Sequence, residues 1–114
     1  MANKYINIPV LVSVSTITAV YTVPASTTAV VRSISVYNTD SSGMDVLLSV
    51  YDNSVTTSFD YDKKTSLAAT TKFEFLNSDN SNVLILEESD KLQVTCSTTG
   101  GLNIMLSILE MSRT

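Results

Sequence analysis

Carboxylates are the side chains of this sequence with the clearest capacity for chemistry, and they occur in three short groups. The groups are Asp60 with Asp62, Asp79 among Asn77, Asn80 and Asn82, and Glu87 with Glu88 and Asp90. Carboxylate and amide oxygens bind Ca²⁺, but none of the groups has the ordered ligand spacing of a known calcium loop. Asp and Asn are also ordinary residues of β-turns, so the groups predict turns between strands rather than a metal site.

The composition excludes the common catalytic constellations. With no histidine and 1 cysteine, the chain cannot form a Ser-His-Asp triad, a Cys-His pair or a structural zinc site. The chain has 3 glycines, Gly43, Gly100 and Gly101, and their spacing does not match a phosphate-binding loop. A hydrolase with paired carboxylates needs a deep cleft, which 114 residues have little material to wall. We therefore expect no enzyme activity, no metal and no cofactor.

Cys96 and the tyrosines are the remaining candidates for chemistry, and packing explains both better. Cys96 lies on the apolar side of an alternating run, and no histidine is available to activate it. A single cysteine forms no internal disulfide, so the fold does not depend on an oxidising compartment. Tyrosines could stack on sugars, as in a carbohydrate-binding module, but most of them fall on predicted strands. These are Tyr21, Tyr37, Tyr51 and Tyr61.

Charge and hydropathy exclude two classes of partner. The net charge is −4 and the 7 basic residues are scattered apart from Lys63-Lys64, so no stripe can track nucleic-acid phosphates. The longest apolar run, from Ile8 to Val12, contains Pro9 and is too short for a membrane span or a secretory signal. We expect a soluble protein made in a cytoplasm, without nucleic-acid or membrane partners.

The stretch from Asp90 to Glu110 carries the clearest strand pattern, with two alternating runs around a glycine pair. The apolar sets are Leu92, Val94 and Cys96 on the first run, and Leu102, Ile104, Leu106 and Ile108 on the second. Strict alternation places each set on one face of a half-buried strand. If Thr99-Gly100-Gly101 forms a three-residue loop, Val94 faces Leu106 and both sets share one side. The sequence therefore predicts a β-hairpin in this register.

Alternation predicts the earlier strands as well. They are Ile8–Val14, Ile17–Val23, Ala29–Tyr37, Asp45–Tyr51, Ser54–Tyr61, Thr71–Leu76 and Val83–Leu86. Pro9 places the first strand at a sheet edge, because proline donates no ladder hydrogen bond. The expected inward sets are Ile17, Ala19, Tyr21 and Val23; Val30, Ile34 and Val36; Val46, Leu48 and Val50; Val55, Thr57, Phe59 and Tyr61; and Phe73 with Phe75. Pro24–Thr27 is expected as a turn, and Asp62–Ala69 and Asn77–Asn82 as loops.

These strands define the expected architecture. About eight or nine short strands separated by turns indicate an all-β antiparallel β-sandwich, of either jelly-roll or Ig-like topology. Residues 1–7 follow no strand pattern, so we expect an N-terminal arm that a neighbouring subunit orders. Residues 8–114 are expected to form a single sandwich domain.

Several stretches resemble a known group of proteins. From Tyr21 to Asn38, a Thr-Val-Pro-Ala turn leads into a long strand ending in Asn, as in small virion proteins of tailed bacteriophages. Leu84–Leu92, the Ser-Thr-Thr-Gly-Gly turn from Ser97 and the closing Ile108–Glu110 are similar to the C-terminal part of those proteins. The matching pieces cover about half of the chain. The resemblance implies a β-sandwich without catalytic residues, found on heads as a decoration or cement protein, or in tails and fibres.

The resemblance implies a non-enzymatic virion structural protein. We expect a capsid decoration or cement protein that binds the major capsid protein or other virion proteins and stabilises the head. The alternative is a tail or fibre component, including a module that binds the host surface or its carbohydrates. A third hypothesis is a free carbohydrate-binding module of a host enzyme, but the absence of tryptophan argues against it.

An outward apolar surface supplies the candidate interface. Opposite the inward set of the last strand lie Met105, Leu109 and Met111, and opposite that of Asp45–Tyr51 lie Leu47 and Tyr51. A contiguous apolar patch usually marks an interface, and methionine adapts to an irregular partner. We expect these residues to pack against another subunit, with a homotrimer favoured, or against the capsid. The alternative is that a loop of the same chain covers them.

Overall fold

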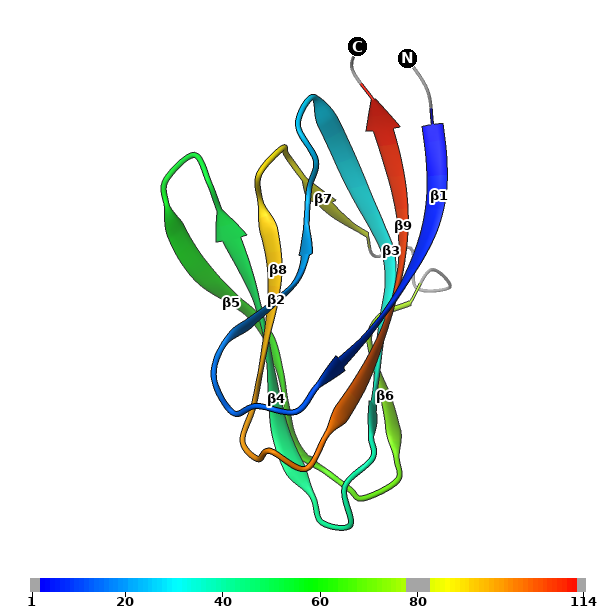
Figure 1. The fold of residues 1–114 in the computed structure, drawn as a ribbon, viewed down its shortest axis with the longest axis vertical. Coiled ribbons are helices and arrows are strands. Elements are labelled where there is room, and N and C mark those ends of the chain that lie inside the picture. The colour runs from blue at the N-terminus through cyan, green and yellow to red at the C-terminus, as the bar shows by residue number, and fades with distance from the viewer. Residues whose placement is uncertain (1–2, 78–82, 113–114) are drawn as a thin grey trace.

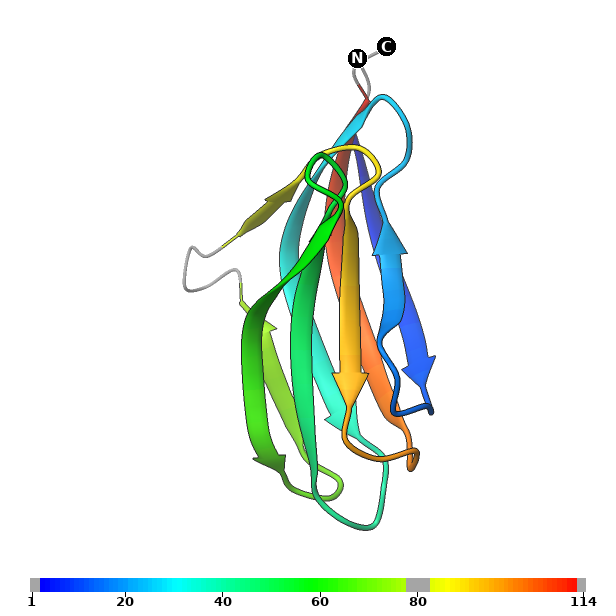
Figure 2. The same cartoon turned by 90° about the vertical axis from the view of Figure 1, so that its left-hand side faces the viewer.

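The computed structural model describes residues 3–77 and 83–112, and the regular secondary structure of this part of the chain is entirely β. The strands are β1 (Asn3–Val12), β2 (Thr18–Thr22), β3 (Thr27–Asn38), β4 (Met44–Asp52), β5 (Thr57–Leu67), β6 (Lys72–Leu76), β7 (Leu84–Leu86), β8 (Lys91–Cys96) and β9 (Leu102–Ser112). They form two antiparallel sheets that face each other (Figures 1 and 2). The predicted all-β antiparallel sandwich is confirmed.

The strands pair in nested order. Sheet A runs β1-β9-β3-β6, with β7 also paired to β3, and sheet B runs β2-β8-β4-β5. The first strand therefore pairs with the last, the second with the last but one, and so on inward to β4 with β5. The chain is one long antiparallel hairpin whose successive strand pairs alternate between the sheets. This arrangement is a jelly roll, the first of the two topologies that the sequence left open.

The predicted hairpin between the last two strands is wrong. β8 pairs with β2 and β4 in sheet B, whereas β9 pairs with β1 and β3 in sheet A. Alternation did predict their buried faces, since the apolar sets of both strands face the core. It does not specify which strand lies alongside, and here the two apolar sets lie on facing sheets instead of on adjacent strands.

The glycine turn serves as a crossing between the sheets. Gly101 has φ of 116°, and a Cβ there would lie 2.7 Å from Thr39 Oγ1. The loop is held by its neighbours: Ser97 N–H donates to Asp45 O at 3.0 Å, and Thr39 N–H donates to Gly101 O at 3.3 Å. Glycine is required here because the backbone is left-handed and approaches Thr39 closely. A hairpin loop requires glycine for the same reason, so the sequence alone does not distinguish it from a loop that crosses between sheets.

Bulges explain two errors in the predicted inward sets. In β2 the register shifts between Ala19 and Tyr21, so Val20 and Tyr21 are both buried while Ala19 and Ile17 are exposed. An extra residue reverses the alternation beyond it. Val23 is buried as predicted.

The second bulge lies in β3, where the register against β9 shifts between Val31 and Ser33. Val31 and Ile34 are fully buried on either side of Arg32, and Val30 lies on the outer face. The inward assignment of Val30 is therefore wrong, whereas Ile34 and Val36 are buried as predicted.

The separate N-terminal arm is also corrected by the structure. Asn3 pairs with Met111, and the ladder continues to Val12 opposite Leu102. Residues 3–7 are therefore the first half of β1, and residues 1 and 2 lie outside the described part of the chain. Polar residues form a strand here because β9 supplies a partner. β1 is an edge strand, as Pro9 predicted.

The fifth strand differs most from its prediction. β5 continues through the expected loop to Leu67, and the expected inward residues Val55, Phe59 and Tyr61 are exposed. The strand lies at the edge of sheet B, and its register against β4 shifts twice. Pairing with β4 thus extends the strand without providing a core for its side chains. The other predicted loop extends over residues 78–82, which lie outside the described residues.

The remaining predicted strands are present, although β1 ends at Val12 instead of Val14. β6 presents Phe73 and Phe75, whose rings meet edge to face with centroids 5.1 Å apart. In β4, Val46 and Leu48 are buried and Val50 packs against the core.

Candidate binding surface

The acidic groups that the structure describes lie in different parts of the fold. Asp60 and Asp62 are exposed on β5, whereas Asp90 is 7% exposed. Its carboxylate accepts N–H hydrogen bonds from Asn53 at 3.0 Å and Glu87 at 2.9 Å, so it ties two loops together. Within the described ranges, no three His, Cys, Asp or Glu side chains come together as a metal site would require. Asp79, in the remaining group, lies outside these ranges.

Two buried groups that could titrate are structural. Burial raises the pKa of the Cys96 thiol, which keeps it protonated and unreactive. Tyr21 on β2 reaches across the sandwich, and its hydroxyl donates to Glu110 Oε2 on β9 at 2.6 Å. Burial, then this hydrogen bond, then the charge of Glu110 raise the pKa of Tyr21. The phenol therefore stays neutral and links the two sheets.

The outer face of sheet A carries a row of apolar side chains. The row consists of Tyr5, Leu109, Val30 and Ile85 from β1, β9, β3 and β7, each directly opposite the next in the ladder. Directly opposed residues point to the same side of a sheet. Tyr5 is 73% exposed and Ile85 is 64% exposed, while Leu109 and Val30 between them are half-buried. We call these four residues the apolar row.

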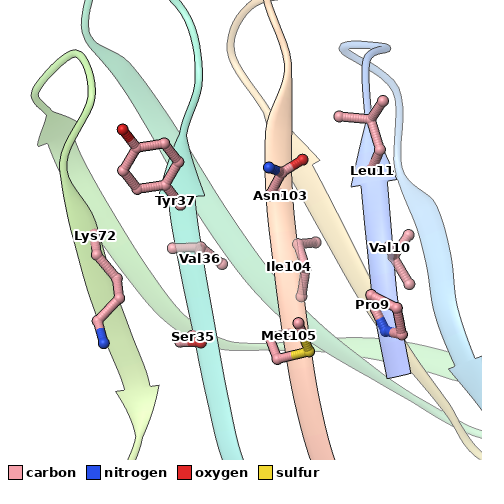
Figure 3. A pocket seen from close by; sticks show the side chains of 10 residues that line it. All are labelled: Pro9, Val10, Leu11, Ser35, Val36, Tyr37, Lys72, Asn103, Ile104 and Met105. Atoms are coloured by element: carbon pink, nitrogen blue, oxygen red, sulfur yellow. The ribbon is translucent and has the colours of Figure 1, made fainter. Parts of the chain in front are cut away.

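A groove lies toward the other end of the same face (Figure 3). It has a volume of about 400 Å³. Two rows of residues across β3, β9 and β1 line it. One row is Tyr37, Asn103 and Leu11, and the next, two residues along each strand, is Ser35, Met105 and Pro9. Lys72 on β6 lies beside Tyr37. We call this the Tyr37 groove.

A polar strip separates the apolar row from the Tyr37 groove. It contains Asn7 opposite Ser107, which in turn lies opposite Ser33, with Arg32 at the bulge beside them. Together with Tyr5, these residues line a second groove of about 410 Å³. The outer face of sheet A thus has two apolar regions with a hydrophilic band between them.

The structure divides the predicted interface residues between the two sheets. Met105, Leu109 and Met111 lie on the outer face of sheet A, where Met105 is exposed and the other two are half-buried. Leu47 and Tyr51 lie on the outer face of sheet B, and Lys91 Nζ lies 5.3 Å from the ring centroid of Tyr51. The whole sandwich separates the two sets, so they cannot form one patch.

Sequence reasoning missed the most exposed residues of the surface. Tyr5, Leu11 and Ile85 are each more than half exposed. One signal was present: Val83–Leu86 is apolar at every position, so a strand there must present apolar residues on both sides. Which strands stand beside Leu109 could be learned only from the register.

Comparison of the chain with family models, with curated proteins and with solved structures gives no match. No helix in residues 3–77 and 83–112 has the length and apolar character needed to cross a membrane. The fold and surface define a jelly-roll sandwich in which the outer face of sheet A is apolar in two regions.

Proposed function

We propose that the protein is a non-enzymatic structural component of a bacteriophage virion that binds the head surface through the outer face of sheet A. The observation that carries the proposal is the apolar row, in which exposed Tyr5 and Ile85 flank Leu109 and Val30. Scattered apolar residues are normal on a surface, but a contiguous set marks an interaction site. Jelly rolls are also a common architecture of viral capsid proteins.

The shape of the surface suits a large partner. The row crosses four adjacent strands, about 15 Å at the usual strand spacing, and projects from the sheet. β9 is hydrogen-bonded on both sides, to β1 and β3, so the surface is held before binding. A pre-organised apolar strip adds little ordering cost on association. Such a protein strengthens a capsid by adding contacts between neighbouring capsomers.

A tail or fibre component that binds carbohydrate is the second candidate, and the Tyr37 groove favours it. Tyr37 is 39% exposed and stands beside the amide of Asn103. An aromatic face beside a hydrogen-bonding amide is a suitable arrangement for a sugar ring.

The copy number in purified phage particles tests the proposal. We expect on the order of hundreds of copies per particle, because head proteins follow the symmetry of the capsid. A small multiple of three or six copies would indicate the tail instead. Absence from purified particles would overturn the virion assignment.

Variants of the apolar row test the surface itself. Tyr5→Glu with Ile85→Glu should abolish binding of the purified protein to particles lacking it, because burial of an unpaired carboxylate opposes the contact. Val55→Glu is the matched control, since Val55 is 53% exposed but lies in the β4–β5 turn. Equal binding by both variants would exclude the apolar row as the contact.

A further inference from the structure

The free edge of β5 is a second surface with the features of an interaction site. β5 is 11 residues long and lies at the end of sheet B, where within the described residues it pairs with β4 alone (Figure 2). Its other edge therefore presents backbone groups that no described strand pairs. An open strand edge is a template for pairing with another chain.

The register against β4 determines which way the side chains of β5 point. Asp60 lies opposite Ser49 and Lys63 opposite Leu47, both on the outer side of sheet B. Phe59 and Lys64 lie opposite Val50 and Val46, which belong to the inner face. Lys64 Nζ stands 5.2 Å from the ring centroid of Phe73 on sheet A, which agrees with this inner position.

A bulge makes the charge pattern self-complementary. The register shifts between Leu48 opposite Asp62 and Ser49 opposite Asp60, so Tyr61 is the extra residue. As a result, Asp60 and Lys63 share the outer side although they are three positions apart. Phe59 and Lys64 share the inner side in the same way.

The sides of β5 and the attraction between its opposite charges together favour one arrangement of two copies. Residues directly opposed in an antiparallel pair must point to the same side, and like charges must not meet. Placing Asp60 of one copy opposite Lys63 of the other satisfies both rules, and it also places Phe59 opposite Lys64. A shift of one residue in one direction opposes Asp60 to Asp62, and in the other it opposes Asp62 to Asp62. Parallel pairing in register opposes every charge to itself.

We propose that two copies of this chain associate through antiparallel pairing of their β5 edges about a two-fold axis, with Asp60 of each opposite Lys63 of the other. The pairing joins two four-stranded B sheets into one continuous sheet. It also places the ammonium of Lys64 beside the exposed ring of Phe59, a favourable contact.

The edge strands β1 and β5 differ in their capacity to pair with an added strand. Charges, bulges and prolines on edge strands limit association, so β5, which carries charges and bulges, should pair only where its charges attract. β1, at one edge of sheet A, carries Pro9, which cannot donate to an added strand. β5 contains no proline, and its opposite charges attract one another when Asp60 lies opposite Lys63. One strand edge buries less than the roughly 1,200–2,000 Å² of a standard interface, so we expect a reversible dimer.

Sedimentation velocity of the full chain over a range of concentrations tests the proposal. The wild-type chain should show a monomer–dimer equilibrium. Asp60→Lys and Lys63→Asp should each weaken the dimer by about tenfold or more, because each places like charges opposite one another twice. The double variant D60K/K63D should restore it, since it exchanges the charges. Glu74→Lys and Lys4→Asp change the net charge equally on sheet A and should have no effect.

Cross-linking checks the register independently. In the proposed dimer Ser58 of one copy lies opposite Thr65 of the other, and within one extended strand the two are too far apart to join. Mild oxidation should therefore link S58C/T65C into covalent dimers, while S58C alone should remain monomeric on a denaturing gel. A chain that stays monomeric, a trimer, a dimer insensitive to the charge reversals or the absence of this cross-link would each overturn the proposal.

Discussion

The two sheets of this sandwich are alike on their inner faces and differ on their outer faces. Inside, both contribute fully buried aliphatic side chains, such as Leu106 on sheet A and Leu48 on sheet B. Outside, sheet A presents the apolar row and the Tyr37 groove, whereas sheet B presents a hydrogen-bonded polar surface. There Ser58 donates to Gln93 Oε1 at 2.8 Å, and Lys91 covers the ring of Tyr51. Folding accounts for the inner faces of both sheets, whereas the proposed binding function rests on the asymmetry between the outer faces.

The largest effects should come from the inner faces, and they should be equal in the two sheets. Leu106→Ala and Leu48→Ala each remove a fully buried side chain, so each should lower the free energy of unfolding by about 2–5 kcal/mol. Urea unfolding monitored by circular dichroism measures both losses. A loss confined to one variant would mean that the sheets do not share one cooperative core.

A polar anchor between the sheets should give the next largest effect. Asn38 ends β3 and is fully buried, and its amide donates to the carbonyl oxygens of Ser42 and Leu67 at 3.0 Å each. Its Oδ1 accepts the N–H of Asp40 at 2.8 Å. Asn38→Ala leaves these groups unsatisfied and should cost about 1–3 kcal/mol. Thr39→Ala, at the exposed neighbouring position, is the control, and equal losses would show that Asn38 is not the anchor.

The link between Tyr21 and Glu110 should make stability depend on alkaline pH. Because the folded pKa of Tyr21 is raised above its ordinary value of 10.0, the folded state keeps a proton that the unfolded chain releases. The contribution is complete below pH 10 and is lost as pH rises, at up to about 1.4 kcal/mol per pH unit. Tyr21→Phe should unfold with a shallower pH dependence above pH 10. Parallel curves for wild type and variant would contradict this role.

These effects also show which parts of the molecule the sequence could specify. Alternation predicted the buried faces of β4, β8 and β9, because burial on one side of a strand imposes a period of two. It could not predict that β8 and β9 lie in different sheets, since the same pattern fits adjacent strands and facing ones. Single extra residues at Val20 in β2 and Arg32 in β3 reversed the alternation on which the predicted inward faces depended. No residue type in the sequence predicts such a bulge.

The candidate surface was predictable only in part, for the same reason. Met105 and Leu109 follow from the alternation of β9 alone. Tyr5 and Ile85 join Leu109 only through the pairing of β9 with β1 and of β3 with β7. A surface built across strands depends on register, which is a property of the whole sheet.

Truncation of the exposed side chains of the apolar row should have the smallest effect on stability and a large effect on binding. Tyr5→Ser with Ile85→Ser changes two exposed side chains of sheet A, so the free energy of unfolding should shift by about 0.5 kcal/mol or less per site. Binding to particles lacking the protein should nevertheless fall by about tenfold or more, because apolar area buried at the contact is lost. Co-sedimentation with particles measures the binding, and a circular dichroism melt confirms folding.

The matched variant on sheet B is Leu47→Ser with Tyr51→Ser. These half-buried residues belong to the polar outer face, where Lys91 already covers Tyr51, so their truncation should leave binding unchanged while costing some stability. If the sheet B variant lost binding and the sheet A variant kept it, the roles of the two faces would be reversed. Equal losses of binding in the two variants would mean that both outer faces contact the particle, as they would between two capsomers. The apolar row carries the contact only if binding falls for sheet A alone.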